Sequence, residues 1–149
     1  MRCLIINGPN LNMLGIREPE IYGSQTYREL LSYIERVSAE QMIYSEVCQS
    51  NHEGKIVDMI QQARGKFDGI IINPAAYTHT SVAILDALKA AGLPAVEVHL
   101  TEPKTREPFR GISYAGMACQ ARFAGMGFEG YARAIEWLKN NMNIKGANN

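Results

Sequence analysis

Three groups of polar residues along the chain have the types and spacing needed for acid–base chemistry on a small polar molecule. They supply a phenol, imidazoles, amides, hydroxyls and guanidinium groups, a set that suits a hydroxylated carboxylate better than an apolar ligand. The first group is Asn7, Asn10, Asn12, Arg17 and Tyr22; the second is Asn73, Thr78, His79 and Ser81; the third is His99, Thr101, Arg106 and Arg110. The sequence therefore predicts a site for a small hydroxylated acid where the fold brings these groups together.

Tyr22 and Arg17 are candidates for a base and the cation that activates it. The ordinary pKa of a phenol is about 10, so a tyrosine acts as a base near neutral pH only when its phenolate is stabilised. The two residues lie five positions apart in one loop, and Pro19 and Gly23 can fold that loop so that they meet. The alternative interpretation is an aromatic residue at the rim and a solvated loop charge.

His99 is a candidate general acid. It ends an apolar segment two residues after Glu97, and residues i and i+2 of a strand share one face. The Glu97 carboxylate can therefore orient the imidazole, and an oriented imidazole can donate a proton to a leaving group. The alternative is a histidine at a strand end that bonds only to the backbone.

His52 and His79 raise the question of a metal site. They follow different expected strands, and neither belongs to a ligand pattern such as HExxH. We therefore predict that no metal is bound. Asn51 is interpreted as a helix cap, with Glu53 and Asp58 on the first turns, where the helix dipole favours negative charge.

The glycines and cysteines have structural interpretations. Segment 125–130 fits the glycine pattern of dinucleotide-binding loops, but too little chain follows it to supply the further strand and acidic residue of such a site. Its glycines indicate a tight turn or close packing of a helix on a strand. Cys3, Cys48 and Cys119 lie in apolar segments without paired spacing, which predicts reduced, buried thiols.

Hydrophobic patterning predicts the elements that must position these residues. Short segments rich in Ile and Val alternate with longer segments of helical periodicity, as is typical of a parallel sheet. The expected strands are 3–6, 42–48, 69–73, 95–99 and a segment within 118–126. The expected helices are 26–41 capped by Thr26, one containing 56–63, 81–92 and a segment within 130–141. Residues 145–149 are expected to fray.

This order of elements predicts an α/β fold with a doubly wound sheet of five parallel strands in the order 2-1-3-4-5. In such sheets, ligands bind beyond the carboxyl ends of the strands, at the point where the strand order reverses. Each of the three polar groups follows the first, third or fourth strand, and these strands are neighbours in the predicted order. We therefore expect the groups to converge on one crevice.

Composition predicts one compact domain, residues 1–149, in the cytoplasm. Its 149 residues, of which 46% are hydrophobic, suit a single core. Fifteen basic residues balance fifteen acidic ones, so no overall field attracts nucleic acid or an anionic membrane. The apolar segment before Gly8 is too short for a secretory signal, and no later segment approaches the length of a membrane span.

Several segments together resemble one enzyme family. GPNLNMLGIREPEIYG at 8–23 is similar to the opening signature of type II 3-dehydroquinate dehydratases. The same family is resembled by QSNHEG at 49–54, NPAAYTHTSVAILDAL at 73–88, VEVHL at 96–100, Arg106-Glu107, Phe109-Arg110, Ser113 and the glycines before Tyr131. The similarity covers nearly all of residues 3–138. The chain departs from the usual pattern at Ala75, at Thr101-Glu102-Pro103 and at Gly111-Ile112.

The resemblance implies a flavodoxin-like subunit, assembly into a homododecamer built as a tetramer of trimers, and chemistry without a cofactor. The implied reaction is the trans-elimination of water from 3-dehydroquinate through an enolate to give 3-dehydroshikimate, in the shikimate or quinate pathway. The usual glycine is replaced by Ala75, and Glu102 adds a carboxylate that we expect to weaken the binding of an anionic substrate.

The resemblance also implies roles for individual residues. Tyr22 matches the proton acceptor, Arg17 the residue that stabilises its phenolate, and His99 the proton donor to the leaving hydroxyl. Asn10 matches an amide that holds a water against the enolate oxygen. The groups around the substrate match Asn73, His79, Arg110 and the backbone of Leu100 and Thr101, and Asp86 matches a residue contributed from an adjacent subunit.

Other protein classes are alternatives. A flavin-binding module of similar fold needs a Ser/Thr-rich phosphate loop after its first strand, and a receiver domain needs clustered acidic residues there; this chain has Asn7-Gly8. A type I dehydroquinase catalyses the same reaction through a lysine imine on a barrel of about 250 residues. The chain is too short for that barrel.

Overall fold

Five parallel strands form one sheet in the predicted order. The computed structural model describes residues 1–16 and 18–146, with 19, 22 and 143–146 described as backbone only. The strands are β1 (Arg2–Asn7), β2 (Tyr44–Gln49), β3 (Gly69–Asn73), β4 (Ala95–His99) and β5 (Ala121–Ala124). They are arranged β2-β1-β3-β4-β5, with parallel pairing at each step. The predicted doubly wound topology is confirmed.

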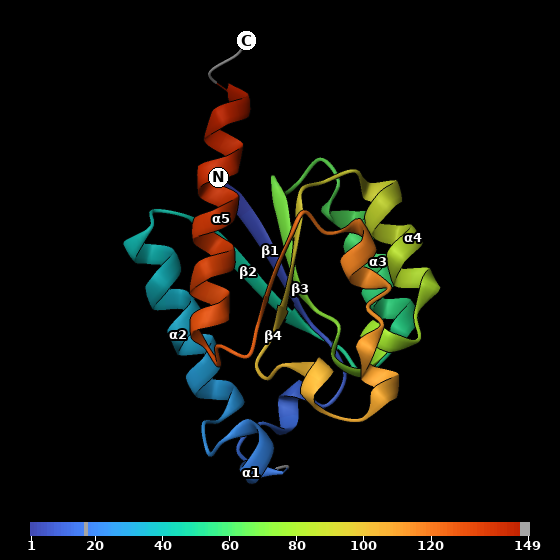
Figure 1. Ribbon diagram of the computed structural model, residues 1–149. Helices are drawn as coiled ribbons and strands as arrows, with labels where there is room; N and C mark the ends of the chain where they lie inside the picture. Colours follow the sequence, from blue (N-terminus) through green and yellow to red (C-terminus); the bar gives the residue numbers. More distant parts are fainter. Residues whose placement is uncertain (17, 147–149) are drawn as a thin grey trace.

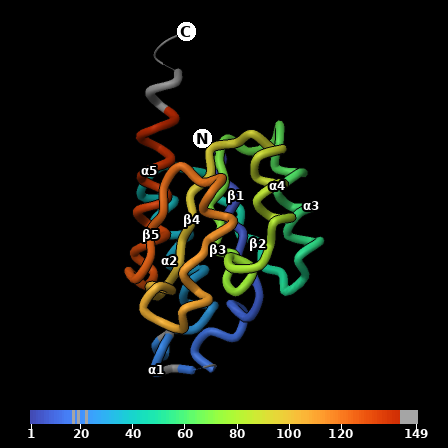
Figure 2. The backbone as a smooth tube through the Cα atoms, turned by 45° about the vertical axis from the view of Figure 1, so that its right-hand side comes forward, coloured from blue at the N-terminus to red at the C-terminus, as the bar shows by residue number. Residues whose placement is uncertain are grey.

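Helices cover both faces of the sheet. They are α1 (Pro19–Tyr22), α2 (Tyr27–Glu40), α3 (Glu53–Ala63), α4 (Val82–Ala91) and α5 (Glu129–Gly146). Helices α2 and α5 lie on one face, and α3 and α4 lie on the other (Figure 1). The view turned by 45° keeps the same layers, with the loops after β1, β3 and β4 gathered at one end (Figure 2). The fold therefore places the three predicted groups at that end.

Two apolar cores follow from alternation along the strands. Ile5 and Ile71 pack with residues of α2 and α5, whereas Ile6 and Ile72 pack with residues of α3 and α4. Every residue of β3 is buried, as expected for a central parallel strand that is covered on both faces. The middle of the sheet is therefore a rigid base for the polar residues at its strand ends.

The predicted helix starts at Thr26 and Ser81 are confirmed by their capping bonds. The Thr26 hydroxyl accepts from the Glu29 backbone N–H, and the Glu29 carboxylate accepts in return from the Thr26 N–H, at 2.6 Å. The Ser81 hydroxyl accepts from the backbone N–H of Ile84 at 2.9 Å. These bonds satisfy backbone donors that the first turn of a helix leaves without intrahelical partners.

Two expected boundaries were wrong. β2 begins at Tyr44, two residues later than expected, because Met42 has φ +57° in the turn that follows α2. Helix α5 runs to Gly146, past the expected end near Asn141, because no Gly or Pro interrupts the chain between these two residues. The expected tail overlaps the end of this helix, and residues 147–149 lie outside the described part of the chain.

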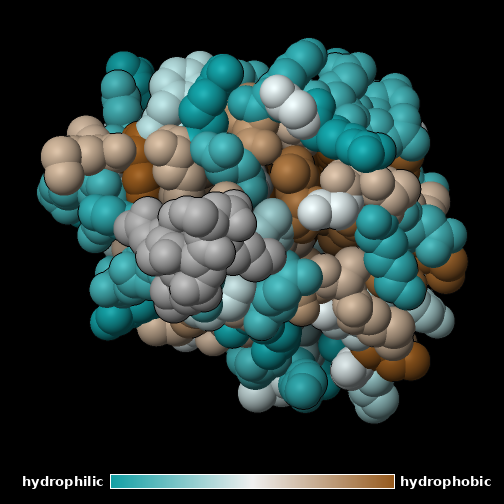
Figure 3. Space-filling model, turned by 90° about the horizontal axis from the view of Figure 1, so that it is seen from above, coloured by the Kyte–Doolittle hydropathy of each residue, from teal (hydrophilic) through white to brown (hydrophobic). Residues whose placement is uncertain are grey.

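The end of the molecule opposite the gathered loops has a mixed surface. Hydrophilic side chains cover most of it, with apolar ones showing between them (Figure 3). Among the described residues, no helix has both the length and the apolar character needed to cross a membrane.

Candidate active site

One pocket lies at the carboxyl ends of β1, β3 and β4, and residues from all three predicted groups line it. From the first group it contains Asn10, from the second Asn73 and His79, and from the third His99, Thr101, Arg106 and Arg110, and Leu100 lines it as well. Four members of the groups are not among its lining residues: Asn7, Asn12, Thr78 and Ser81. Arg17 and the side chain of Tyr22 lie outside the described residues. The loops thus converge as the strand order predicts.

The loop after β1 reaches the pocket because Gly8 permits close contact with the loop after β3. The Gly8 N–H donates to the Asn73 carbonyl at 2.8 Å, and a Cβ at Gly8 would lie 2.6 Å from the Pro74 carbonyl oxygen. Asn10 follows with φ +67°, a conformation that asparagine tolerates better than most residues. The two loops can therefore join only where residue 8 has no side chain.

Asn51 holds this first loop and does not cap α3, so the expected cap was wrong. Its Oδ1 accepts from the Asn10 backbone N–H and from Gln49 Nε2, each at 3.0 Å. The N-cap of α3 is His52, which makes no side-chain capping bond. The Asn51 carboxamide accepts from the Asn10 backbone amide instead of capping α3. It can do so because β2 ends beside β1, which brings residue 51 to the first loop.

A buried hydrogen-bond network of Asn7, Asn73 and Tyr131, called the floor here, supports the pocket through Asn73, the one of the three that lines it. The Tyr131 hydroxyl donates to Asn7 Oδ1 at 2.7 Å and accepts from Asn73 Nδ2 at 3.2 Å. Asn7 and Asn73 are partners in the β1–β3 register, so one hydroxyl reaches both. Burial raises the pKa of Tyr131, which keeps its phenol neutral and able to donate.

Glu97 and His99 form the predicted pair on β4. His99 Nε2 lies 2.8 Å from Glu97 Oε1, and the same oxygen accepts from the Ser113 hydroxyl at 2.6 Å. Burial by itself raises the pKa of Glu97, but the bonds from His99 and Ser113 and the charge of Arg122 outweigh it, so the pKa lies below its usual range. The carboxylate is thus ionised at neutral pH and fixes the ring, and Nδ1 is the nitrogen that Glu97 does not engage.

The segment after β4, residues 100–113, is called the arginine loop here because it brings Arg106 and Arg110 to the pocket. Arg110 Nε donates to Glu107 Oε2 at 2.6 Å, and Arg106 Nε lies 3.9 Å from the same oxygen. Glu107 is about half exposed, whereas both guanidinium side chains are only 18% exposed. Two cations beside one pocket suit an anionic ligand.

The arginine loop also fixes the tautomer of His79. His79 Nδ1 lies 2.6 Å from the carbonyl oxygen of Ile112, and a carbonyl can only accept, so Nδ1 carries a proton. His79 Nε2 then remains as the second polar atom of a ring that lines the pocket.

Ala75 occupies a left-handed position at the pocket wall. Its φ is +51°, and its backbone N–H donates to Asn73 Oδ1 at 3.2 Å. This conformation places the Cβ of an L-residue close to its own backbone, and only glycine adopts it without strain. The structure thus shows a backbone conformation that favours glycine at the position where this chain has alanine.

Glu102 does not add charge to the pocket, so the expected weakening of anion binding is not supported. Its carboxylate accepts from Arg122 Nη2 at 2.9 Å and from Arg122 Nη1 at 3.3 Å, and it is not among the lining residues. The bond from Arg122 holds the pKa of Glu102 below its usual range, and the pair is neutral overall.

One residue that the resemblance assigned to the substrate site, Asp86, lies away from the pocket. Asp86 is exposed on α4 and does not line the pocket of its own chain. No cluster of His, Cys, Asp or Glu among the described residues is suited to a metal ion. Gly125 and Gly127 have positive φ, and a Cβ at Gly130 would lie 3.2 Å from Val98 Cγ1, which confirms the turn and the close packing expected for 125–130.

Some residues that build the site were not singled out from the sequence. Tyr131 and Arg122 lie far along the chain from the residues that they contact. The available signal was the buried strand register: asparagines at aligned ends of β1 and β3 need a shared polar partner. No local pattern identifies which tyrosine supplies that partner.

Comparisons with known proteins identify the family to which this sequence is similar. A profile of the family described as "Dehydroquinase class II" matches residues 1–139. The "3-dehydroquinate dehydratase" of Clostridium acetobutylicum is 50% identical over 140 residues, covering 94% of this chain and 97% of that protein. The "Catabolic 3-dehydroquinase" of Verticillium alfalfae is 48% identical over 144 residues, covering 97% and 96%.

A solved structure shows the same similarity in three dimensions. The type II dehydroquinase from Butyrivibrio crossotus superposes with a TM-score of 0.91 at 47% identity, over 93% of this chain and 97% of that one. The family match spans the loops that form the pocket, including Asn10, His99 and Arg110. The chain therefore belongs to the class II dehydroquinase family.

Proposed function

We propose that this protein is a 3-dehydroquinate dehydratase, a hydro-lyase that removes water from 3-dehydroquinate to give 3-dehydroshikimate. The observation that carries the proposal is that His99, held by the buried Glu97 carboxylate, lines a pocket that Arg106 and Arg110 also line. An oriented imidazole beside cations that suit a carboxylate supports a proton donor next to an anion site. The relatives named 3-dehydroquinate dehydratase and catabolic 3-dehydroquinase support the same substrate.

In the proposed mechanism, the Tyr22 phenolate takes a proton from the carbon next to the substrate ketone, and Arg17 stabilises that phenolate. The C–H electron pair moves into the carbonyl to form an enolate, and Asn10 holds a water against the enolate oxygen. When the enolate collapses, the C–O bond of the hydroxyl on the next carbon breaks. His99 gives that hydroxyl a proton, so it leaves as water. Proton return from Tyr22 to His99 through solvent resets the enzyme.

The remaining pocket residues bind the substrate in this proposal. Arg110 pairs with the carboxylate, and Asn73 and His79 bond to ring hydroxyls together with the backbone of Leu100 and Thr101. The Tyr131 hydroxyl, which accepts from Asn73, and the Ile112 carbonyl, which accepts from His79, keep the Asn73 and His79 side chains in fixed orientations. Preorganised donors of this kind avoid reorganisation during the reaction.

The proposal includes a single catalytic domain over 1–149, a cytoplasmic location and action in the shikimate or quinate pathway without a cofactor. It also includes a homododecamer built as a tetramer of trimers, in which Asp86 reaches the pocket of a neighbouring subunit. The exposure of Asp86 on α4 supports this role, because the residue does not line the pocket of its own chain.

The reaction is tested by following the ultraviolet absorbance of the enone product with 3-dehydroquinate as substrate. We expect turnover by the wild type and a loss of kcat of about 10²- to 10⁴-fold in Tyr22→Phe, the usual contribution of an acid–base group. Tyr44→Phe, at an exposed tyrosine of β2, is the matched control and should retain full activity. Absence of product with folded wild-type protein would refute the proposed reaction.

A further inference from the structure

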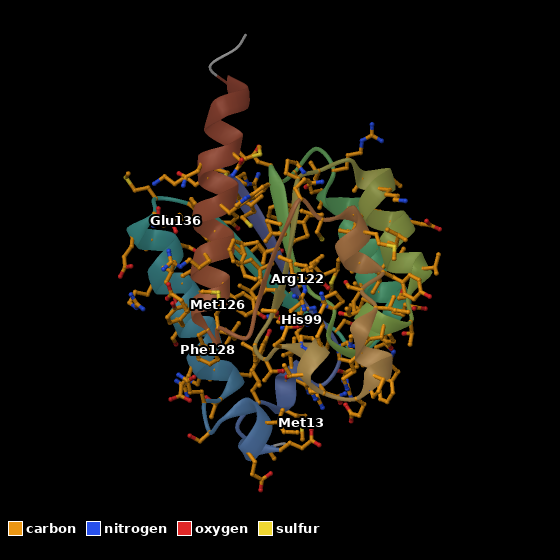
Figure 4. All side chains as sticks on the ribbon, viewed as in Figure 1. Met13, His99, Arg122, Met126, Phe128 and Glu136 are labelled. Atoms are coloured by element: carbon orange, nitrogen blue, oxygen red, sulfur yellow. The ribbon has the colours of Figure 1, made fainter. Side chains whose placement is uncertain are left out.

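Arg122 bridges two carboxylates that lie behind the pocket. It is the register partner of Glu97 in the β4–β5 pair, and its Nε lies 3.6 Å from Glu97 Oε2. Its other two nitrogens bond to both oxygens of Glu102, at 2.9 and 3.3 Å. Arg122 projects from β5 near His99 at the end of β4 (Figure 4). One guanidinium thus contacts both the partner of His99 and the start of the arginine loop.

Glu97 has unequal surroundings at its two oxygens. Oε1 is shared by His99 and Ser113, whereas Oε2 accepts no hydrogen bond from the residues that the structure describes. The side chain of Glu97 is fully buried, so solvent does not screen Oε2. Arg122 is therefore well placed to act on the charge of the Glu97–His99 pair.

Glu97 also has other titratable and charged neighbours. The Cys119 thiol is also near, but burial and the charge of Glu97 raise its pKa to about 12, so it stays neutral. His79, Lys104 and Arg110 line the same cavity behind the site as Glu97 and Arg122. Of the described arginine and lysine residues that line this cavity, Arg122 is the one that forms an ion pair with Glu97.

Glu102 fixes the first turn of the arginine loop. Its carboxylate accepts from the Lys104 backbone N–H at 3.2 Å, and its carbonyl accepts from the Thr105 hydroxyl at 2.8 Å. The turns that follow carry Arg106 and Arg110 to the pocket. The hydrogen bonds from Arg122 on β5 to Glu102 therefore fix the position at which the arginine loop leaves the sheet.

We propose that Arg122 is a positioning residue with two effects: it anchors the arginine loop through Glu102, and its charge tunes how firmly the Glu97–His99 pair holds its proton. This inference rests on the proposed function for the role of His99 as proton donor. Arg122 itself does not line the substrate pocket, so it acts only through other residues.

The two effects predict different results for charge-removing and charge-keeping variants. In Arg122→Gln the pair loses a nearby positive charge, so its protonated form is favoured and His99 titrates at higher pH, by about half a unit. Arg122→Lys keeps the charge but loses the pair of hydrogen bonds to both oxygens of Glu102. KM should therefore rise by about fivefold, while the titration of His99 stays unchanged. Glu102→Gln removes the charge that neutralises Arg122, so His99 should titrate at lower pH while KM rises.

His99 can be observed directly by NMR, since the chain has only three histidines. The ring signal of His99 is assigned with a His99→Gln variant and titrated in each arginine and glutamate variant. The matched control is Arg133→Gln on α5, where an arginine also pairs with two glutamates, Glu129 and Glu136, but all three side chains are about half exposed. We expect Arg133→Gln to leave both the titration and KM unchanged.

An upward shift in Arg122→Gln that is absent in Arg122→Lys and Arg133→Gln supports the proposal. The proposal would be overturned if the midpoint of the His99 titration were unchanged in Arg122→Gln, or if Arg122→Lys shifted that midpoint equally. If Arg122→Gln does not fold, Glu102→Gln tests the charge coupling instead. A His99 titration midpoint in that variant that is unchanged or higher than in the wild type would contradict the coupling. Absence of turnover in the wild type refutes only the proposed reaction, since the NMR titration needs no substrate.

Discussion

In the floor of the pocket, neutral amides and a phenol are buried and bonded to one another, whereas the arginine loop on the same pocket is held by ion pairs that are partly exposed. The floor belongs to strand ends and a helix, and its geometry is set by the β1–β3 register. The loop consists of short turns, and its contacts run between charged side chains. One site thus combines two kinds of support.

The difference has a physical basis. A buried neutral hydrogen bond is insensitive to salt, and its loss leaves unsatisfied groups that cannot reach water. An exposed ion pair is weakened by salt and solvent, and contributes little to stability. We therefore expect changes in the floor to appear mainly as lost stability, and changes in the loop to appear mainly in KM.

The largest effect is expected for Tyr131→Phe. The change leaves Asn7 Oδ1 and Asn73 Nδ2 buried without their shared partner, which should lower the free energy of unfolding by about 3 kcal/mol. Urea unfolding measures the loss, and kcat/KM should fall with it. Tyr33→Phe is the control, since its hydroxyl bonds to an exposed glutamate, and it should change stability by less than about 1 kcal/mol. Equal losses in the two variants would contradict the importance of the floor.

Gly8→Ala should have the next largest effect. The added methyl group meets the Pro74 carbonyl oxygen at 2.6 Å, so the backbone of one loop must shift, at a cost of about 2 kcal/mol. KM should rise because Asn10 moves with the loop. Gly54→Ala, on α3 with open space at its Cβ, should stabilise slightly. Thermal unfolding that ranks Gly8→Ala above the wild type would exclude the proposed close contact.

Ala75→Gly should stabilise the protein, by about 0.5–1 kcal/mol. Removing Cβ relieves the left-handed conformation, and this gain exceeds the extra flexibility of glycine in the unfolded chain. Ala90→Gly on the exposed side of α4 should instead destabilise, by about 1 kcal/mol. The pair is compared by Tm, and loss of stability at position 75 would show that the backbone there is not strained.

The smallest effect is expected in the arginine loop. Glu107→Gln removes the carboxylate beside Arg106 and Arg110 and should leave Tm unchanged, with a rise in KM of about twofold. Added salt should raise KM of the wild type and reduce the difference between the two proteins. Glu136→Gln on α5 is the control for a surface glutamate. A large drop in Tm for Glu107→Gln would mean that the loop supports the fold as the floor does.

Much of the site could be predicted from sequence because its residues follow strand ends. The order of strands places Asn73, His79, His99 and Arg110 at one edge of the sheet, and the i, i+2 spacing of Glu97 and His99 predicts their contact. Asn51 was assigned wrongly because a local capping pattern says nothing of a competing backbone amide from Asn10. Likewise, the effect of the Glu102 carboxylate on anion binding depends on its bond to Arg122, and the sequence does not show that bond.

By itself, the sequence predicted the alternation of strands and helices and the strand order, because these depend on periodicity and local spacing, and its motifs indicated the family through their resemblance to known members. Only the tertiary structure decided that Tyr131 joins Asn7 to Asn73 and that Arg122 joins Glu97 to Glu102. Those contacts join residues that are up to 124 positions apart. Register and helix packing fix such pairs, and both result from burying the whole core at once.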